Sequence, residues 1–171
     1  MKTAVIAVAL CLAASASLAD ETWLAFRDPG GAFTVEFSGT PTVGHSPSKT
    51  PNGLDMDTAT YDVSKTDYEL TIADTFGPQV QLDPGRAIDG SVEGFKGEVA
   101  QVVSDSISTL DGQVGREVVG IDKDGDTMHD RIYVVNNHVY QVMTVTPKSV
   151  TGGAVDPVLK HFAESFHFAA H

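Results

Sequence analysis

The sequence predicts an α+β domain in which a central antiparallel β-sheet carries helices on its faces. Most apolar segments alternate apolar with polar residues and end at turn-forming residues, as half-buried antiparallel strands do. Two other segments begin with Asp-Pro and continue with apolar residues at helical spacing. The chain has no internal repeat, so we expect a single domain over residues 20–171.

The first half of the chain contains three predicted strands and one predicted loop. Ala32–Phe37 alternates apolar with polar residues, whereas Pro41–Asn52 contains three prolines and several hydroxyl side chains, which indicates a surface loop. Met56–Val63 and Asp67–Asp74 predict a hairpin. In the second of these strands the apolar positions alternate: Tyr68, Leu70 and Ile72.

Two helices are predicted, each from an Asp-Pro start. Asp83 suits the N-cap and Pro84 the first turn. The apolar residues that follow share one helix face: Ile88, Val92, Phe95 and Val99. Glycines in this segment each cost about 1 kcal/mol relative to alanine, so the helix depends on tertiary packing. Asp156 and Pro157 repeat the start signal before a second apolar stripe: Leu159, Phe162 and Phe166.

The strongest strand pattern lies in the second half of the chain. After a β-rich run at Gln101–Leu110, three ranges predict a meander: Arg116–Asp122, Thr127–Val135 and His138–Thr146. Asn136 and Asn137 suit a two-residue type I′ turn, because asparagine tolerates positive φ. That turn would place Tyr133 opposite Tyr140 and Val135 opposite His138.

Residues 1–19 have the three parts of a bacterial secretory signal peptide. Lys2 provides the positive charge, Ala4–Ala14 the apolar core, and Ser17 and Ala19 the small residues of a cleavage site. The apolar run is shorter than the about 20 residues of a transmembrane helix. We therefore expect cleavage after Ala19 and a periplasmic or secreted protein with no membrane span.

Removing these 19 of the 171 residues leaves 152, and the single cysteine, Cys11, leaves with them. A domain of this length buries roughly 68–70% of its unfolded surface, so it needs no disulfide. The leader contains one lysine and no acid, so the remaining 10 basic and 23 acidic residues give a formal charge of −13. This charge disfavours nucleic acid and anionic lipid as partners and suits cations or basic protein surfaces.

Four short segments of the chain carry a family resemblance: Phe33–Thr42 (FTVEFSGTPT), Gly115–Glu117, Asp130–Tyr140 and Phe162–Phe166 (FAESF). Together they resemble bacterial exported members of the PsbP-like superfamily. The resemblance implies a PsbP-like α/β/α sandwich and a role as an exported binding or accessory module. It transfers no site residue, and it does not imply photosynthesis.

The stretch Asp122–Asp130 contains one candidate metal motif. Asp122, Asp124 and Asp126 have the spacing of the first three calcium ligands of an EF-hand loop. Thr127 stands where that loop needs glycine, and Tyr133 where it needs a bidentate glutamate. A hairpin turn with Asp-Gly at its tip is the preferred interpretation, with weak calcium binding as the alternative.

The carboxy-terminal segment contains a second candidate, because imidazole and carboxylate groups suit zinc or copper. Its members are His161, Glu164, His167 and His171. The apolar stripe predicts that the helix ends near Ser165, which breaks the helical spacing of the last two histidines. We therefore predict no metal site and no cofactor here.

No catalytic motif is present: the sequence has no GxSxG, no HExxH and no cysteine beyond residue 19. His129 and Asp130 are adjacent on a predicted strand, so they point to opposite faces and form no dyad. Arg131 is expected to pair with Glu117 across two strands. The sequence therefore predicts no catalytic residue.

Aromatic residues offer two further binding candidates. Trp23, with Leu24 and Phe26, follows the predicted cleavage site and is expected to pack on the core, with a partner-binding tip as the alternative. Tyr133 and Tyr140 are expected to pack in the sheet, with a ligand platform as the alternative.

Together these observations predict an exported, soluble, non-enzymatic module of the cell envelope that binds a protein or a small ligand. The segment Pro41–Asn52 is the first expected contact surface, because loops beside rigid sheets often carry binding residues. The alternatives are an enzyme whose site is assembled from distant strands and a weak calcium-binding protein. The sequence identifies neither the ligand nor the oligomeric state.

Overall fold

The structure is a computed structural model that describes residues 21–50, 52–151, 153 and 155–169. The predicted signal peptide at 1–19 and its cleavage site at Ala19 lie outside the described residues, as does His171. No helix within the described ranges is long and apolar enough to cross a membrane.

Seven antiparallel strands form the large sheet of the described chain, in the order β3-β4-β5-β9-β8-β7-β6. Their bounds are β3 Thr42–Lys49, β4 Asp55–Ser64, β5 Glu69–Phe76, β6 Val99–Leu110, β7 Gln113–Asp122, β8 Thr127–Val135 and β9 His138–Thr146. A small sheet has the order β1-β2-β10. It consists of β1 Leu24–Arg27, β2 Phe33–Phe37 and β10 His167–Phe168, and the helices are α1 Pro84–Glu98 and α2 Asp156–Ser165.

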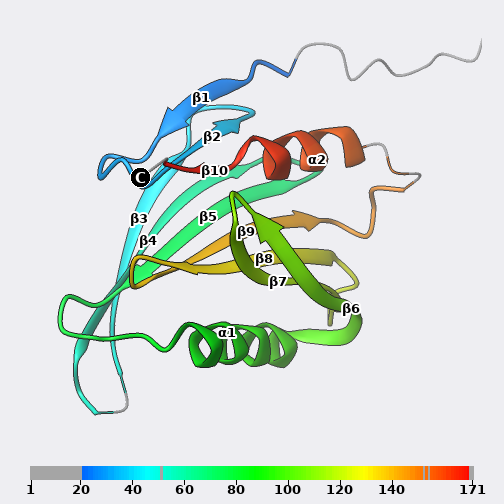
Figure 1. Cartoon of the computed structure of the whole chain (residues 1–171). Helices are drawn as coiled ribbons and strands as arrows, with labels where there is room; N and C mark the ends of the chain where they lie inside the picture. The colour runs from blue at the N-terminus through cyan, green and yellow to red at the C-terminus, as the bar shows by residue number, and fades with distance from the viewer. Residues whose placement is uncertain (1–20, 51, 152, 154, 170–171) are drawn as a thin grey trace, which may run out of the picture.

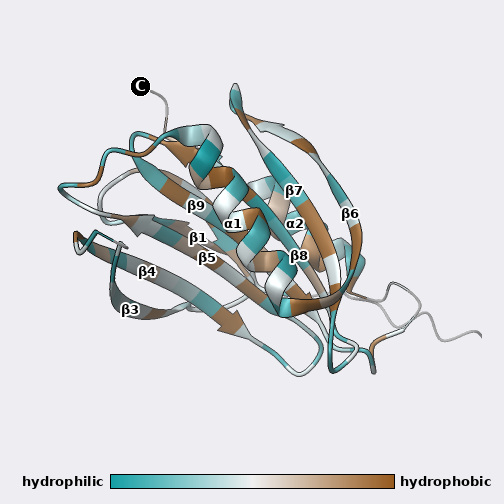
Figure 2. Ribbon diagram, turned by 90° about the horizontal axis from the view of Figure 1, so that it is seen from below, coloured by the Kyte–Doolittle hydropathy of each residue, from teal (hydrophilic) through white to brown (hydrophobic). Residues whose placement is uncertain are grey.

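The large sheet separates two hydrophobic clusters (Figure 1). On one face, Phe95 of α1 packs in a cluster with Val118 of β7 and Ile132 of β8. On the other face, Phe33 of β2 and Phe162 of α2 are fully buried in the larger cluster. Figure 2, seen from the α1 side, shows α1 lying over the large sheet.

The sequence predicted an α+β fold around a central antiparallel sheet, and the structure has an antiparallel sheet and two helices. Strands, however, make up most of the described structure. The face opposite α1 is covered by the small sheet as well as by α2. A sandwich with helices alone on both faces therefore describes the molecule only in part. The cause is the pairing of β2, which takes β1 on one edge and β10 on the other.

The predicted hairpins are confirmed, and so is the one register that was predicted, at the 136–137 turn. β4 pairs with β5 in antiparallel fashion from Asp57 and Phe76 to Ser64 and Glu69. Both residues of the 136–137 turn have positive φ, at 50° and 68°. The pairing partners across β8 and β9 are those expected: Tyr133 with Tyr140 and Val135 with His138.

The two helix starts differ from one another. The side chain of Asp83 caps α1 by accepting a hydrogen bond from the backbone N–H of Arg86 at 3.0 Å, as predicted. At α2, Val155 is the N-cap and makes no capping hydrogen bond, while Asp156 is the first helical residue. A carboxylate in the first turn still interacts favourably with the helix dipole.

The prediction of a loop at Pro41–Asn52 is wrong. Residues 42–49 form the edge strand β3, which pairs with β4 from Thr42 and Asp62 to Lys49 and Asp55. Every residue of β3 is exposed except Gly44, which is half-buried. The strand therefore has no buried face, and the alternation of apolar and polar residues that marks a strand is missing. Pro47 is tolerated because the outer side of an edge strand needs no backbone donor.

Candidate functional site

A cleft of about 650 Å³ opens between the loop after β1 and strands β3, β4, β5 and β9. We call it the aromatic cleft. Its lining residues include Phe26, Val43, Tyr61, Phe76, His138 and Tyr140, together with the carboxylates of Asp28 and Asp74. Its volume lies within the roughly 300–1,000 Å³ that is typical of small-molecule sites.

An aspartate and a histidine form the centre of one wall. Asp74 and Phe76 of β5 pair with Tyr140 and His138 of β9, so all four side chains lie on the same sheet face. The imidazole of His138 stacks between the rings of Phe76 and Tyr140, at centroid distances of 5.0 and 5.8 Å. Its Nδ1 atom lies 2.7 Å from Oδ1 of Asp74. These contacts hold the imidazole in one orientation.

Burial raises the pKa of the Asp74 carboxyl above its usual value. The hydrogen bond and charge of His138 act to lower that pKa, and the neighbouring carboxylate of Asp28 raises it further. The two aspartates therefore repel one another across the cleft when both are ionised.

Asp28 lies in the turn between β1 and β2. The hydroxyl of Tyr61 donates to its Oδ1 at 3.1 Å, and the backbone N–H of Ala32 donates to its Oδ2 at 3.0 Å. Burial, followed by the hydrogen bond to Asp28, raises the pKa of Tyr61 to about 12. Tyr61 is therefore a neutral phenol that fixes the carboxylate in place.

The cleft has an acidic lining. Asp28 and Asp74 are 9% and 7% exposed, and no lysine or arginine is found among the described lining residues. Its basic groups are His138 and His45, and Nδ1 of His45 lies 3.0 Å from Oδ2 of Asp57. The described lining contains no serine, threonine or cysteine, so its chemically active side chains are carboxylates, imidazoles and phenols.

Sequence reasoning missed Asp28, Tyr61 and Asp74 as site residues. One signal was present for Asp74, because the alternation of Leu70 and Ile72 continues to it and places a carboxylate at a position that faces the core. Asp28 and Tyr61 gave no such signal, since 33 positions separate them and only the fold brings them together.

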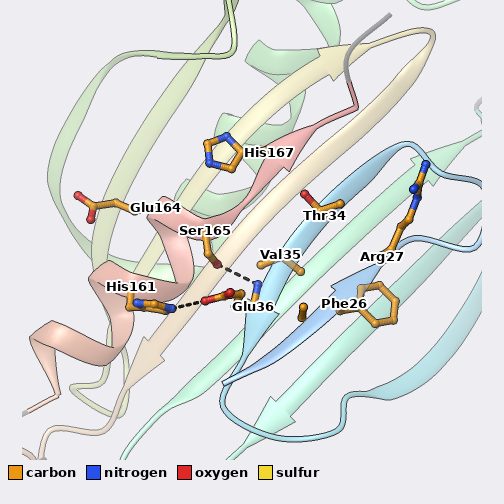
Figure 3. A pocket seen from close by; sticks show the side chains of 10 residues that line it. Phe26, Arg27, Thr34, Val35, Glu36, His161, Glu164, Ser165 and His167 are labelled. Carbon is orange, nitrogen blue, oxygen red and sulfur yellow. Dashed lines mark hydrogen bonds and ion pairs between the residues drawn. The ribbon is translucent and has the colours of Figure 1, made fainter. Parts of the chain in front are cut away.

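A second pocket, of about 530 Å³, lies over β1, β2 and α2 and contains the predicted histidine cluster (Figure 3). Nε2 of His161 lies 2.6 Å from Oε2 of Glu36, and both side chains are 43% exposed. His167 instead approaches Asp111, with Nδ1 3.2 Å from Oδ1, while Glu164 points away from Glu36.

The two histidines thus have separate carboxylate partners. In the described part of the chain, no three His, Cys, Asp or Glu side chains gather as a metal site would require. His171, the remaining member of the predicted group, is outside the described residues.

The acidic stretch after β7 forms a turn around Asp122. Its Oδ1 accepts the backbone N–H groups of Asp124 and Asp126, at 2.8 and 2.9 Å, and Gly125 has a φ of 89°. The ammonium group of Lys148 bonds to the carbonyl oxygen of Asp124. Oδ1 of Asp122 and the carbonyl oxygen of Asp124 are thus engaged within a hairpin turn, which is the preferred interpretation.

The cross-strand partners on β7 and β8 are also as expected. Nε of Arg131 donates to Oε1 of Glu117 at 2.9 Å, and Nε2 of His129 lies 2.7 Å from the same oxygen. Burial acts to raise the pKa of Glu117, but the guanidinium of Arg131 holds it below its usual value. His129 and Asp130 are adjacent on β8, so their side chains face opposite sides of the sheet. Asp130 accepts a hydrogen bond from the side chain of Gln141 on the other face.

The aromatic candidates pack largely as structural groups. Trp23 is half-buried against the larger cluster, and its ring centroid lies 4.0 Å from that of His161 in a tilted arrangement, whereas Leu24 is 40% exposed. Tyr133 is buried, and its hydroxyl lies 2.8 Å from Oγ of Ser108. Tyr140 is buried as well, but it also lines the aromatic cleft.

No family model and no curated protein sequence matches this chain. The solution structure of cyanobacterial PsbP from Synechocystis sp. PCC 6803 is similar to it, with a TM-score of 0.51. The match covers 92% of this chain and 99% of that chain. The fold is PsbP-like. Because the two sequences are 12% identical, the PsbP-like fold carries over, but no site residue does.

Proposed function

We propose that the chain without its leader is an exported, non-enzymatic binding module of the cell envelope, and that the aromatic cleft holds its ligand. The cleft carries this proposal, because it combines apolar walls with a few oriented polar groups, as small-molecule sites do. Export is supported by the signal pattern of residues 1–19.

The cleft walls favour binding without a large rearrangement. Tyr61, Asp74 and His138 stand on three adjacent strands of the large sheet, β4, β5 and β9. Their side chains are held by hydrogen bonds and ring stacking. Preorganised side chains lose little conformational entropy on binding, so more of the contact energy appears as affinity.

Native mass spectrometry of the protein purified from its own cell envelope tests this function. We expect a chain of residues 20–171 that carries the additional mass of a small molecule. A bare chain after gentle handling would contradict a tightly held ligand. A chain that retains residues 1–19 would contradict export.

Two matched variants locate the bound mass. Val43 is 54% exposed and pairs with Tyr61 across β3 and β4, so Val43→Trp should fill the cleft mouth and abolish the additional mass. Val114 of β7 is 65% exposed and does not line the cleft, so Val114→Trp should retain it. Equal loss or equal retention in both variants would show that the ligand sits elsewhere.

An enzyme is the second candidate, and the Asp74–His138 pair is the observation that favours it. A carboxylate that orients an imidazole is a common arrangement for a general base. Incubation of the protein with the molecule found by mass spectrometry decides this question. Conversion that stops in His138→Gln would support an enzyme, whereas an unchanged molecule would contradict it.

A further inference from the structure

The charge of the aromatic cleft indicates the chemistry of its ligand. Asp28 and Asp74 are both nearly buried, and Asp28 adds to the raised pKa of Asp74. The described lining contains no lysine or arginine, so the imidazoles of His138 and His45 are its basic groups, and His138 is hydrogen-bonded to Asp74. A cation placed between the two carboxylates would remove their repulsion, whereas an anion would increase it. The formal charge of the whole chain, −12, also raises the local concentration of cations.

The aromatic walls favour an organic cation. The ring centroids of Phe26 and Tyr61 lie 4.9 Å apart, and Phe76, which stacks on His138, also lines the cleft. Aromatic faces attract cations within about 6 Å of the ring centroid, an interaction that strengthens when the site excludes water. Burial raises the pKa of Tyr140, so this ring, like that of Tyr61, remains a neutral phenol.

The size of the cleft argues against a bare metal ion. A volume of about 650 Å³ is far larger than an ion needs, and the described residues provide no group of three metal ligands. The recorded hydrogen bond of Asp74 uses Oδ1, and a carboxylate accepts at both oxygens. Oδ2 can therefore accept a hydrogen bond from a donor group on a ligand.

We propose that the aromatic cleft binds a small protonated amine, with its ammonium group beside Asp74 and Asp28 and its apolar body against the aromatic walls. This inference rests on the proposed function. To that function the inference adds the class of ligand, a protonated amine, and the residue that selects it, Asp74.

Three probes with the same ring separate charge from shape. Benzylamine, benzyl alcohol and benzoate are titrated into the cleaved protein by isothermal titration calorimetry near neutral pH. We expect benzylamine to bind at least about tenfold more tightly than benzyl alcohol, a difference of about 1.4 kcal/mol, and benzoate to bind most weakly. Because this preference is electrostatic, added salt should reduce it.

Asp74→Asn should remove most of the preference for benzylamine over benzyl alcohol, because the two probes differ mainly by the charge that Asp74 attracts. The affinity for the uncharged benzyl alcohol should stay within about threefold of the wild-type value. Asp67→Asn is the matched control, because Asp67 is an exposed carboxylate in the turn before β5. Should Asp74→Asn fail to fold, Val43→Lys tests the same idea from the rim. It places an ammonium group across from Tyr61, so it should weaken benzylamine binding, while Val43→Gln should not.

The outcomes separate the two proposals. Equal affinity for benzylamine and benzyl alcohol would overturn the amine preference and leave the binding module standing. No binding of any probe, in a protein that carries an additional mass in native mass spectrometry, would overturn the amine class alone. Equal losses in Asp74→Asn and Asp67→Asn would place the effect in the general charge of the protein and overturn the site.

Discussion

Asp130 carries a carboxyl group in the core beneath α1. Its side chain is fully buried, Gln141 donates to Oδ2 at 2.6 Å, and Oδ1 has no hydrogen-bond partner among the described residues. Burial raises its pKa to about 7, with a smaller contribution from the charge of Glu98. A carboxyl group in such a site is protonated in mildly acidic solution and must ionise in apolar surroundings at higher pH.

The folded pKa of Asp130 therefore lies above the unfolded value, so its contribution to stability is greatest below the unfolded pKa. That contribution is lost as the pH rises through about 7. We expect the free energy of unfolding to be lower near pH 8 than near pH 5, with a few kcal/mol of the difference due to this group. Urea unfolding of Asp130→Asn at both pH values should show most of the difference removed, and Asp67→Asn should behave as wild type. An unchanged pH dependence in Asp130→Asn would contradict the assignment.

At the scale of the single strand, β7 and β8 pair with an unusually close approach at Gly115. A Cβ atom at Gly115 would collide with the carbonyl oxygen of Ile132 and the ring of Tyr133. Backbone atoms inside a sheet cannot move aside cheaply, so glycine at this position is a packing requirement.

Gly115→Ala should therefore lower the free energy of unfolding by about 1–3 kcal/mol. Gly90 of α1 is the matched control, because a Cβ atom there meets nothing within 4 Å. Gly90→Ala should raise the free energy of unfolding by up to about 1 kcal/mol, since alanine favours the helix. Equal effects of the two substitutions in chemical denaturation would contradict this account.

The turn between β7 and β8 leads to a prediction about calcium. The backbone N–H groups of Asp124 and Asp126 engage Asp122, and the Lys148 ammonium group occupies the same region. A ligand that binds only the folded state raises the melting temperature. We expect the thermal unfolding curve to be the same with calcium and with chelator. An increase in melting temperature that Asp122→Asn abolishes would instead support the weak calcium site.

At the scale of the whole molecule, two sheets of unequal size create the cleft. The small sheet covers the larger cluster, and the turn that carries Asp28 lines the cleft together with β4, β5 and β9. β3, which replaces the predicted loop, supplies Val43 and His45 to the rim. The segment expected to make contacts therefore does border the candidate site, although it does so as a strand.

Local patterns in the sequence were sufficient for most elements. The Asn136–Asn137 turn determined a hairpin register, and Asp83 with Pro84 determined the start of α1, because each acts on neighbouring backbone groups. Strand β3 was missed because an exposed edge strand has no buried face to impose an apolar period.

The sequence by itself determined most strands of the large sheet, both helices and the strong negative charge, since these depend on residue type and short-range spacing. Only the tertiary structure decided that Asp28, Tyr61, Asp74 and His138 share one cleft. They come from β4, β5, β9 and a turn between short strands, and strand order does not follow chain order. Sheet pairing between distant segments is governed by the packing of the whole core, so the site could emerge only with the fold.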